Sequence, residues 1–230
     1  MLYSKLLETY DNIKGICPVA HTFLTVHIGI LIDKDGNFLS AVDASGTGEL
    51  TIAPCTAQSE VRTNNIAPHL LFDNYSYVGN KKEYRKRHAA YIEQLENYVN
   101  EFGDIFAKAV YKYVSKKSLE TDLQSLNIKF EHNTNIIFTV YGIDYANMWT
   151  DYYLSKLPKT DICMITGEQD YIPDAYPARI LSPSSQEKLF VKGCGAGYIA
   201  SQKVIHALQF LNYVNVKNEL QIHKTGVECL

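Results

Sequence analysis

The sequence has no paired cysteines and no long apolar run. Its five cysteines are widely spaced and no CxxC or CxxH motif occurs, which disfavours a disulfide framework or a zinc site and favours reduced thiols. The most apolar stretch, 23–32, is interrupted by Thr25, His27 and Gly29 and is far shorter than the roughly 20 residues that cross a bilayer. The N-terminus lacks the basic-then-apolar order of a signal peptide. We therefore expect a soluble, cytoplasmic protein.

The common catalytic motifs are missing as well. No GxSxG elbow, HExxH pair, Walker A loop or EF-hand loop occurs, and the seven histidines stand singly. Segment 192–197, KGCGAG, precedes a predicted helix, where such a loop can cradle a phosphate, but it lacks the Lys-Ser/Thr ending of a P-loop and favours a flexible connector. We predict no cofactor, no metal site and no catalytic residue. An enzyme of unknown type has only the scattered histidines in its favour.

A general excess of positive charge is missing too. The 230 residues are 46% hydrophobic, as in a globular protein, and their net charge of −3 argues against a simple nucleic-acid binder. Yet segment 81–88, KKEYRKRH, places five positive charges and one negative at the start of a predicted helix, where the helix dipole disfavours cations. The cluster indicates an external anion such as phosphate, with an ordinary solvated face as the alternative. Its candidate phosphate ligands are Lys81, Lys82, Arg85 and Lys86.

Apolar periodicity and turn residues predict an α+β fold: a small N-terminal antiparallel sheet with a hairpin, followed by a mostly helical region. Strands are expected at 22–32, 38–42, 49–53, 136–141 and 161–165, with Gly36 in the hairpin turn. Helices are expected at 1–13, 84–102, 105–114, 120–126, 145–157 and 195–214, and loops at 57–65 and 171–185. The chain divides into a β-rich region 1–80, a helical region 81–170, and a loop with a C-terminal helix at 171–230.

A polar run stands just before the basic cluster. It consists of Arg62, Thr63, Asn64 and Asn65, followed by Asp73 and Asn74. Asparagine amides can bond a base edge through donor and acceptor, while arginine mostly finds phosphates; asparagine is equally typical of turns. The 17 tyrosines can stack on bases, but their places on apolar helix faces favour core or interface packing. The apolar positions Ile66, Leu70 and Leu71 are expected in the core.

Residues 62–78, RTNNIAPHLLFDNYSYV, resemble a motif of the large subunit of type I-C CRISPR–Cas surveillance (Cascade) complexes. That motif has Arg-Thr, two small or polar residues, Ile-x-Pro, and then Asp-Asn-x-x-Tyr-Val. Segments 87–91 (RHAAY), entering a helix, and 163–168 (CMITGE), at a strand end, agree in the same order. The resemblance spans 1–172. It departs at Asn65, where the family commonly has glycine, and after 168, where Tyr176-Pro177 and 183–186 keep only a trace of the family's His-Pro and Gly-Ala-Gln-Ser-Ser-Gly run.

The resemblance implies a non-catalytic subunit of an RNA-guided complex in antiviral defence. Such large subunits recognise the protospacer-adjacent motif in double-stranded DNA and help start strand separation, near the 5′ end of the guide RNA. They act beside other Cascade subunits and a separate helicase-nuclease. On this chain, DNA-motif recognition falls in region 1–80, with asparagines as base readers, arginine and lysine as phosphate ligands, and Asp73 as an anchor of the loop. The candidate DNA-binding residues are Arg62, Thr63, Asn64, Asn65, Asn74, Lys81, Lys82, Arg85 and Lys86.

A second interpretation stays open. Family chains are much longer, so 171–230 is expected to be an incomplete domain. A shortened family member can also dock in the complex as a protein-interaction module without reading DNA, with its tyrosine-rich helices at the interface. Motif-dependent DNA binding separates the two interpretations.

Overall fold

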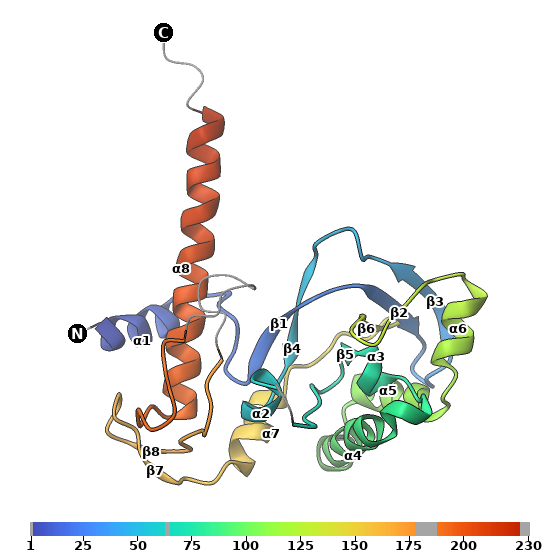
Figure 1. Cartoon of the computed structure of the whole chain (residues 1–230), viewed down its shortest axis with the longest axis horizontal. Helices are drawn as coiled ribbons and strands as arrows, with labels where there is room; N and C mark the ends of the chain where they lie inside the picture. Colours follow the sequence, from blue (N-terminus) through green and yellow to red (C-terminus); the bar gives the residue numbers. More distant parts are fainter. Residues whose placement is uncertain (1, 63–64, 178–187, 226–230) are drawn as a thin grey trace. The chain divides into compact units, whose positions relative to one another are not determined.

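The computed structural model describes residues 2–62, 65–177 and 188–225, with side-chain environments through residue 212. The chain forms two compact units, one of Ala20–Ser155 and one that joins Met1–Val19 to Lys156–Leu230 (Figure 1). The boundaries drawn from the sequence at 80 and 170 each fall inside a unit. The N-terminal segment belongs with the C-terminal one because α1 (Leu2–Asn12) packs against α8 (Tyr198–Thr225), a contact between helices far apart in sequence.

The unit Ala20–Ser155 is built on a four-stranded sheet, whose strands in spatial order are β3 (Phe38–Asp43), β2 (Ile28–Ile32), β6 (Asn135–Val140) and β5 (Asp73–Asn74). The predicted hairpin is confirmed: β2 (Ile28–Ile32) and β3 (Phe38–Asp43) pair antiparallel, and Gly36 in the turn has φ +70°. Strand β6 (Asn135–Val140) returns to lie parallel to β2, and the short β5 (Asp73–Asn74) pairs with its other edge. The sheet is therefore mixed, with one parallel and two antiparallel pairs. The alternation of apolar and polar residues did not predict the parallel β2–β6 pair, because a parallel pair requires a long connection between its strands.

The predicted strand 22–32 is in fact two strands in two sheets. Strand β1 (His21–Thr25) pairs antiparallel with β4 (Leu50–Pro54), whereas β2 belongs to the larger sheet. Between them the backbone changes partner: Val26 N–H donates to Glu49 O at 2.8 Å and His27 N–H to Asn135 O at 3.2 Å. Since both strands are apolar and β-branched, the sequence gives no sign of this switch.

Helices fill the rest of this unit. The longer ones are α4 (Arg85–Phe102), α5 (Ile105–Ser115), α6 (Leu119–Ser125) and α7 (Trp149–Lys156). The short ones are α2 (Ala57–Glu60), α3 (Tyr75–Val78) and the 3-10 turn η1 (Lys82–Tyr84). Gly103 ends α4 with φ +66°, and Asp104 caps α5, both as predicted. The loop predicted at 57–65 is wrong at its start, because Thr56 and Ser59 form a capping box for α2.

Aromatic side chains make much of the core of this unit. Tyr75, Tyr91, Tyr98, Tyr113 and Trp149 are all fully buried. The interpretation of the tyrosines as packing residues is thus confirmed for these. Helix α5 packs on β2 and β6 of the sheet. Leu70 and Leu71 are buried as predicted, but Ile66 is 48% exposed, which makes that core assignment wrong; its neighbour Ala67 is buried instead.

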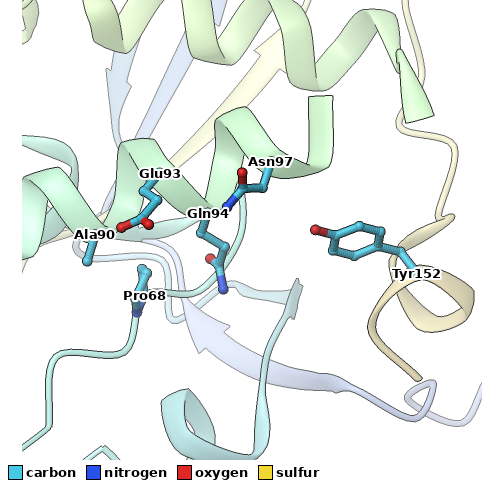
Figure 2. Close-up of a pocket in the computed structure, with 6 residues that line it drawn as sticks. All are labelled: Pro68, Ala90, Glu93, Gln94, Asn97 and Tyr152. Carbon is cyan, nitrogen blue, oxygen red and sulfur yellow. The ribbon is translucent and has the colours of Figure 1, made fainter. Parts of the chain in front are cut away.

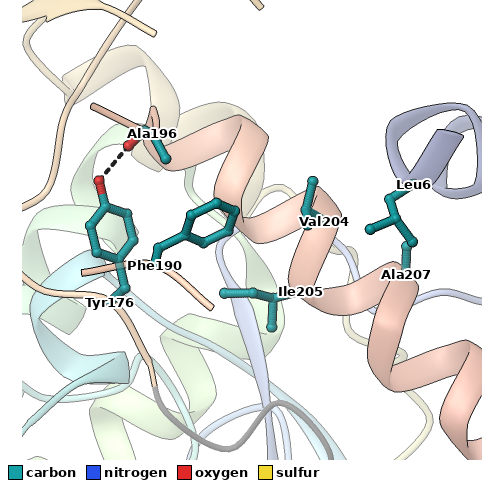
Figure 3. Close-up of a cluster of buried hydrophobic side chains, with 7 residues drawn as sticks. All are labelled: Leu6, Tyr176, Phe190, Ala196, Val204, Ile205 and Ala207. Carbon is teal, nitrogen blue, oxygen red and sulfur yellow. Dashed lines mark hydrogen bonds between the residues drawn. The ribbon is translucent and has the colours of Figure 1, made fainter. Parts of the chain in front are cut away.

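The second unit has its own core between its two terminal helices and a small two-stranded sheet, β7 (Asp161–Ile162) with β8 (Gln169–Asp170). Its buried cluster consists of Leu6, Tyr176, Phe190, Ala196, Val204, Ile205 and Ala207 (Figure 3). The glycine-rich segment 192–197 is fixed to the β7–β8 turn: Gly195 O accepts from Met164 N–H at 2.9 Å, and Gly197 N–H donates to Cys163 Sγ at 3.1 Å. These bonds tie the segment to the fold.

Candidate nucleic-acid interface

A pocket of about 280 Å³ lies in the unit Ala20–Ser155, where the polar loop, α3, α4 and the turn before β6 meet. Its lining residues are Arg62, Asn65, Ile66, Asn74, Ser76, Tyr77, Arg87, His132 and Asn133. Four chain segments separated by up to 71 residues (62 to 133) thus meet at one hollow. Its polar lining consists of amides, hydroxyls, a histidine and two arginines, without a carboxylate among the described residues.

Arg62 reaches this pocket already paired. Its Nη1 and Nη2 bond Asp73 Oδ1 and Oδ2 at 2.8 and 3.1 Å. The carboxylate of Asp73, only 1% exposed, also accepts from the backbone N–H groups of His69 at 2.8 Å and Asn74 at 2.6 Å. Burial raises the pKa of Asp73, and the Arg62 guanidinium opposes that rise. Asp73 therefore anchors the loop, as expected, and Arg62 is its counter-charge.

Asn74 is the N-cap of α3. Its Oδ1 accepts from the backbone N–H of Ser76 at 3.1 Å and from Ser76 Oγ–H at 2.6 Å. A backbone N–H can only donate, so the atom that faces it is the amide oxygen. The acceptor half of the Asn74 amide is therefore occupied within the protein, which removes the two-way base pairing that asparagine offers in general.

Arg87 lies in the first turn of α4 and is exposed. Its Nη1 donates to Ser76 Oγ at 3.1 Å, and its guanidinium sits 5.7 Å from the centre of the Tyr77 ring. The Arg62 guanidinium lies 4.5 Å from the same ring. The next residue, His88, donates from Nδ1 to the Tyr77 carbonyl at 3.1 Å, and burial lowers its pKa. Tyr77 therefore orders two guanidinium groups at the pocket.

The basic cluster is split by the geometry of α4. Residues two apart on an α-helix project about 200° from each other, so Arg85 and Arg87 point to nearly opposite sides. Lys82, Arg85 and Lys86 are exposed and do not line the pocket. Lys81 is also exposed, and its Nζ lies 5.3 Å from the ring centre of Tyr75. Of the cluster, only Arg87 lines the pocket, and Lys81, Lys82, Arg85 and Lys86 form an exposed basic band that precedes it in the sequence.

The structure brings together three of the predicted site residues, Arg62, Asn65 and Asn74. Thr63 and Asn64 lie outside the described residues. Sequence reasoning missed Ser76, Tyr77, Arg87, His132 and Asn133 as pocket residues. Two signals were available: Ser76 and Tyr77 stand inside the 62–78 motif, and Arg87 opens the RHAAY segment. Nothing local marks His132 and Asn133, which reach the pocket through the Tyr75 N–H bond to Thr134 O and the Ser76 N–H bond to His132 O.

A second pocket, of about 250 Å³, lies further along α4. Figure 2 shows its α4 side chains between Pro68 and Tyr152 of α7. Its lining residues are Pro68, Ala90, Glu93, Gln94, Asn97 and Tyr152. It has a carboxylate and no cation among the described residues, which disfavours an anionic ligand. The first pocket, next to the basic band, is therefore the candidate nucleic-acid interface.

The part of the chain that the structure describes holds no group of three or more His, Cys, Asp or Glu side chains suited to a metal ion. Among the described residues, Cys17, Cys55, Cys163 and Cys194 form no disulfide. Among the described helices, none combines the length and hydropathy that a membrane span needs.

Comparison with known protein families places the chain among CRISPR-associated proteins. The model of the CRISPR-associated protein family Cas_Csd1 matches residues 2–189, and the chain belongs to this family. This match confirms the resemblance to the large subunit of type I-C Cascade complexes and extends it past residue 172. No curated protein matches the chain.

Proposed function

We propose that this chain is the subunit, or a portion of the subunit, that recognises the protospacer-adjacent motif in a cytoplasmic type I-C Cascade complex. It binds double-stranded target DNA near the 5′ end of the guide RNA and helps start strand separation. It is non-catalytic, and a separate helicase-nuclease cuts the target. Membership of the Cas_Csd1 family supports the assignment to CRISPR defence.

The pocket is the main observation that supports the proposed recognition of DNA. Arg62, Asn65 and Asn74, all from the motif, line the pocket together with Arg87, and the basic band starts at Lys81, seven residues after the N-cap of α3. In RNA-guided recognition, base pairing with the guide supplies most of the sequence specificity, so the protein needs to read only a short motif and hold the backbone. One small polar pocket next to a row of cations suits that division of labour.

The basic band supplies the phosphate contacts. Lys81, Lys82, Arg85 and Lys86 are exposed. Lys81 and Lys82 lie at the 3-10 turn η1, and Arg85 and Lys86 open α4, where cations are unfavourable for the helix dipole. The ammonium of Lys81 is fixed over the Tyr75 and Phe130 rings, at 5.3 and 5.9 Å from their centres. Fixed cations lose less side-chain freedom on meeting a phosphate, which favours binding.

The test is an electrophoretic shift with the chain assembled with its partner subunits and guide RNA. Duplexes that carry the motif are expected to bind more tightly than duplexes with a scrambled motif, and Asn74→Ala is expected to remove most of that difference. Lys81→Glu with Lys82→Glu should weaken all duplexes alike and lower the salt slope by about 1 for each lost phosphate contact. Equal binding to both duplexes by the wild-type complex would refute motif recognition, and an unchanged salt slope would refute the role of the band.

One observation favours the docking alternative. On the β1–β4 ribbon, Phe23 stands opposite Ile52, and both are exposed together with Leu50 on the same face. Exposed apolar pairs on a sheet are common at protein interfaces. A chain that only docks would co-purify with the other subunits, and the complex would bind duplexes without regard to the motif.

A further inference from the structure

The side chain of Ser76 links Arg87 to Asn74 through two hydrogen bonds, accepting from the first and donating to the second. Arg87 Nη1–H donates to Ser76 Oγ at 3.1 Å, and Ser76 Oγ–H donates to Asn74 Oδ1 at 2.6 Å. A hydroxyl has a single hydrogen, so the bond to Asn74 Oδ1 uses the only donor of Ser76, and the guanidinium occupies one of its two acceptor lone pairs. Because the backbone N–H of Ser76 also donates to Asn74 Oδ1, the amide is held in one orientation by two bonds.

The orientation decides what Asn74 can bind. Its oxygen is occupied, and its Nδ2 has no hydrogen-bond partner among the residues that the structure describes. Nδ2 carries two hydrogens and no acceptor capacity. Toward the pocket, Asn74 is therefore a pure donor, complementary to an acceptor atom and unfavourable to a second donor.

The two arginines of the pocket differ in whether a carboxylate pairs with their charge. Asp73 neutralises Arg62 through both oxygens, whereas Arg87 forms no ion pair with any described carboxylate. Arg87 touches only a neutral hydroxyl and an aromatic ring, and it is exposed. Arginine with an unshared guanidinium binds phosphate by charge-assisted hydrogen bonds. The pocket thus combines one fixed amide donor with one free cation.

We infer that this pocket takes a nucleotide whose base edge shows an acceptor to Asn74 Nδ2, that it rejects an exocyclic amino group there, and that Arg87 holds the adjacent phosphate. The inference rests on the proposed function and sharpens it. Acceptor atoms occur in both grooves, as purine N3 and pyrimidine O2 in the minor groove and as purine N7 in the major groove. Purines that lack one of these atoms tell the two grooves apart.

The experiment uses the assembled complex and a pool of duplexes randomised beside the guide-matched target. The purine most strongly selected is then replaced by its 3-deaza or its 7-deaza analogue. One analogue is expected to bind about 10-fold more weakly to the wild-type complex, in line with the loss of one buried hydrogen bond. Asn74→Ser should lose the same factor on the natural duplex and should no longer distinguish the analogue.

Asn74→Ser is chosen because serine is as good an N-cap as asparagine, so α3 keeps its cap while the amide is lost. Emission of the only tryptophan, the buried Trp149, checks that the unit stays folded. The matched control is Asn97→Ser, an exposed asparagine further along α4 that does not line this pocket, which should bind like wild type. Unchanged motif selection by Asn74→Ser overturns the inference. An unselective wild-type complex overturns the proposed function instead.

Arg87 has a separate readout. Arg87→Gln should weaken selected and unselected duplexes by the same factor and reduce the salt slope by about 1. Lys108→Gln, an exposed cation on α5 away from the pocket lining, is the control and should leave the slope unchanged. Loss of motif selection without a change in slope would show that Arg87 positions Asn74 and does not hold a phosphate.

Discussion

Replacing Arg62 by methionine would leave a buried carboxylate without its counter-charge. Asp73 is 1% exposed and accepts four hydrogen bonds, two from Arg62 and two from backbone N–H groups. Removing one partner of a buried pair costs about 3–5 kcal/mol, because the remaining charge must be desolvated alone or take up a proton. We expect Arg62→Met to lower the free energy of unfolding by an amount in this range.

Two further variants locate the origin of that loss. Arg62→Lys keeps the charge but loses the two-pronged geometry, so it should cost about 1.5–3 kcal/mol, the range for a hydrogen bond to a charged group. Lys34→Met removes an exposed ion pair with Asp35, at 3.8 Å, and should change stability by less than about 1 kcal/mol.

The assay is urea unfolding followed by Trp149 emission, because this single tryptophan is buried in the same unit as the pair. With a slope of about 2 kcal/mol per molar urea, Arg62→Met should lower the midpoint by about 1.5–2.5 M. If Arg62 instead held DNA phosphates and contributed nothing to the fold, Arg62→Met would unfold at the wild-type midpoint and only lose DNA affinity. That result would refute the structural role argued here.

Two other predictions concern the same unit. Burial lowers the pKa of His69 well below its usual range, so the folded unit keeps it neutral while the unfolded chain takes up a proton near pH 6.5. Stability should therefore be complete above pH 6.5 and fall by about 1.4 kcal/mol per pH unit below it, and His69→Gln should reduce this slope in urea titrations at several pH values. Gly36→Ala should destabilise by about 1–3 kcal/mol in urea unfolding, because φ is +70° and its Cβ would lie 2.7 Å from Lys112 Cβ. Gly29→Ala, with no atom within 4 Å of its Cβ, should be neutral in the same assay.

Local signals predicted the elements whose causes are local. Gly36 marks the hairpin because its turn needs a positive φ, and Gly103 and Asp104 mark the break between α4 and α5. The partners of the strands could not be predicted in this way. The parallel β2–β6 pair joins residues more than 100 apart, and the β1–β2 switch depends on which backbone groups Glu49 and Asn135 offer.

The sequence predicted where the site lies better than it predicted the role of each residue in it. The motif placed Arg62, Asn65 and Asn74 together, and the structure brings them to one pocket. Residue type alone made Arg62 a phosphate ligand, but its pairing with Asp73, eleven residues later, appears only in three dimensions. Arg87 was not singled out because it stands among several cations. Its position four residues before the buried Tyr91 nevertheless places it on a different face of α4 from Arg85.

The net charge of −3 hides this arrangement because it counts every charge equally. What an approaching polyanion meets depends on which cations are already occupied. Lys112 pairs with Asp35, and Lys116 Nζ is bound by the Gly36 carbonyl at 2.7 Å and Asn37 Oδ1 at 2.6 Å in the hairpin. The cations at the start of α4 have no such ties to carboxylates among the described ion pairs. The cations of segment 81–87, of which Arg87 lines the pocket, therefore keep their charge, and electrostatic attraction of a duplex depends on such a local cluster more than on the total.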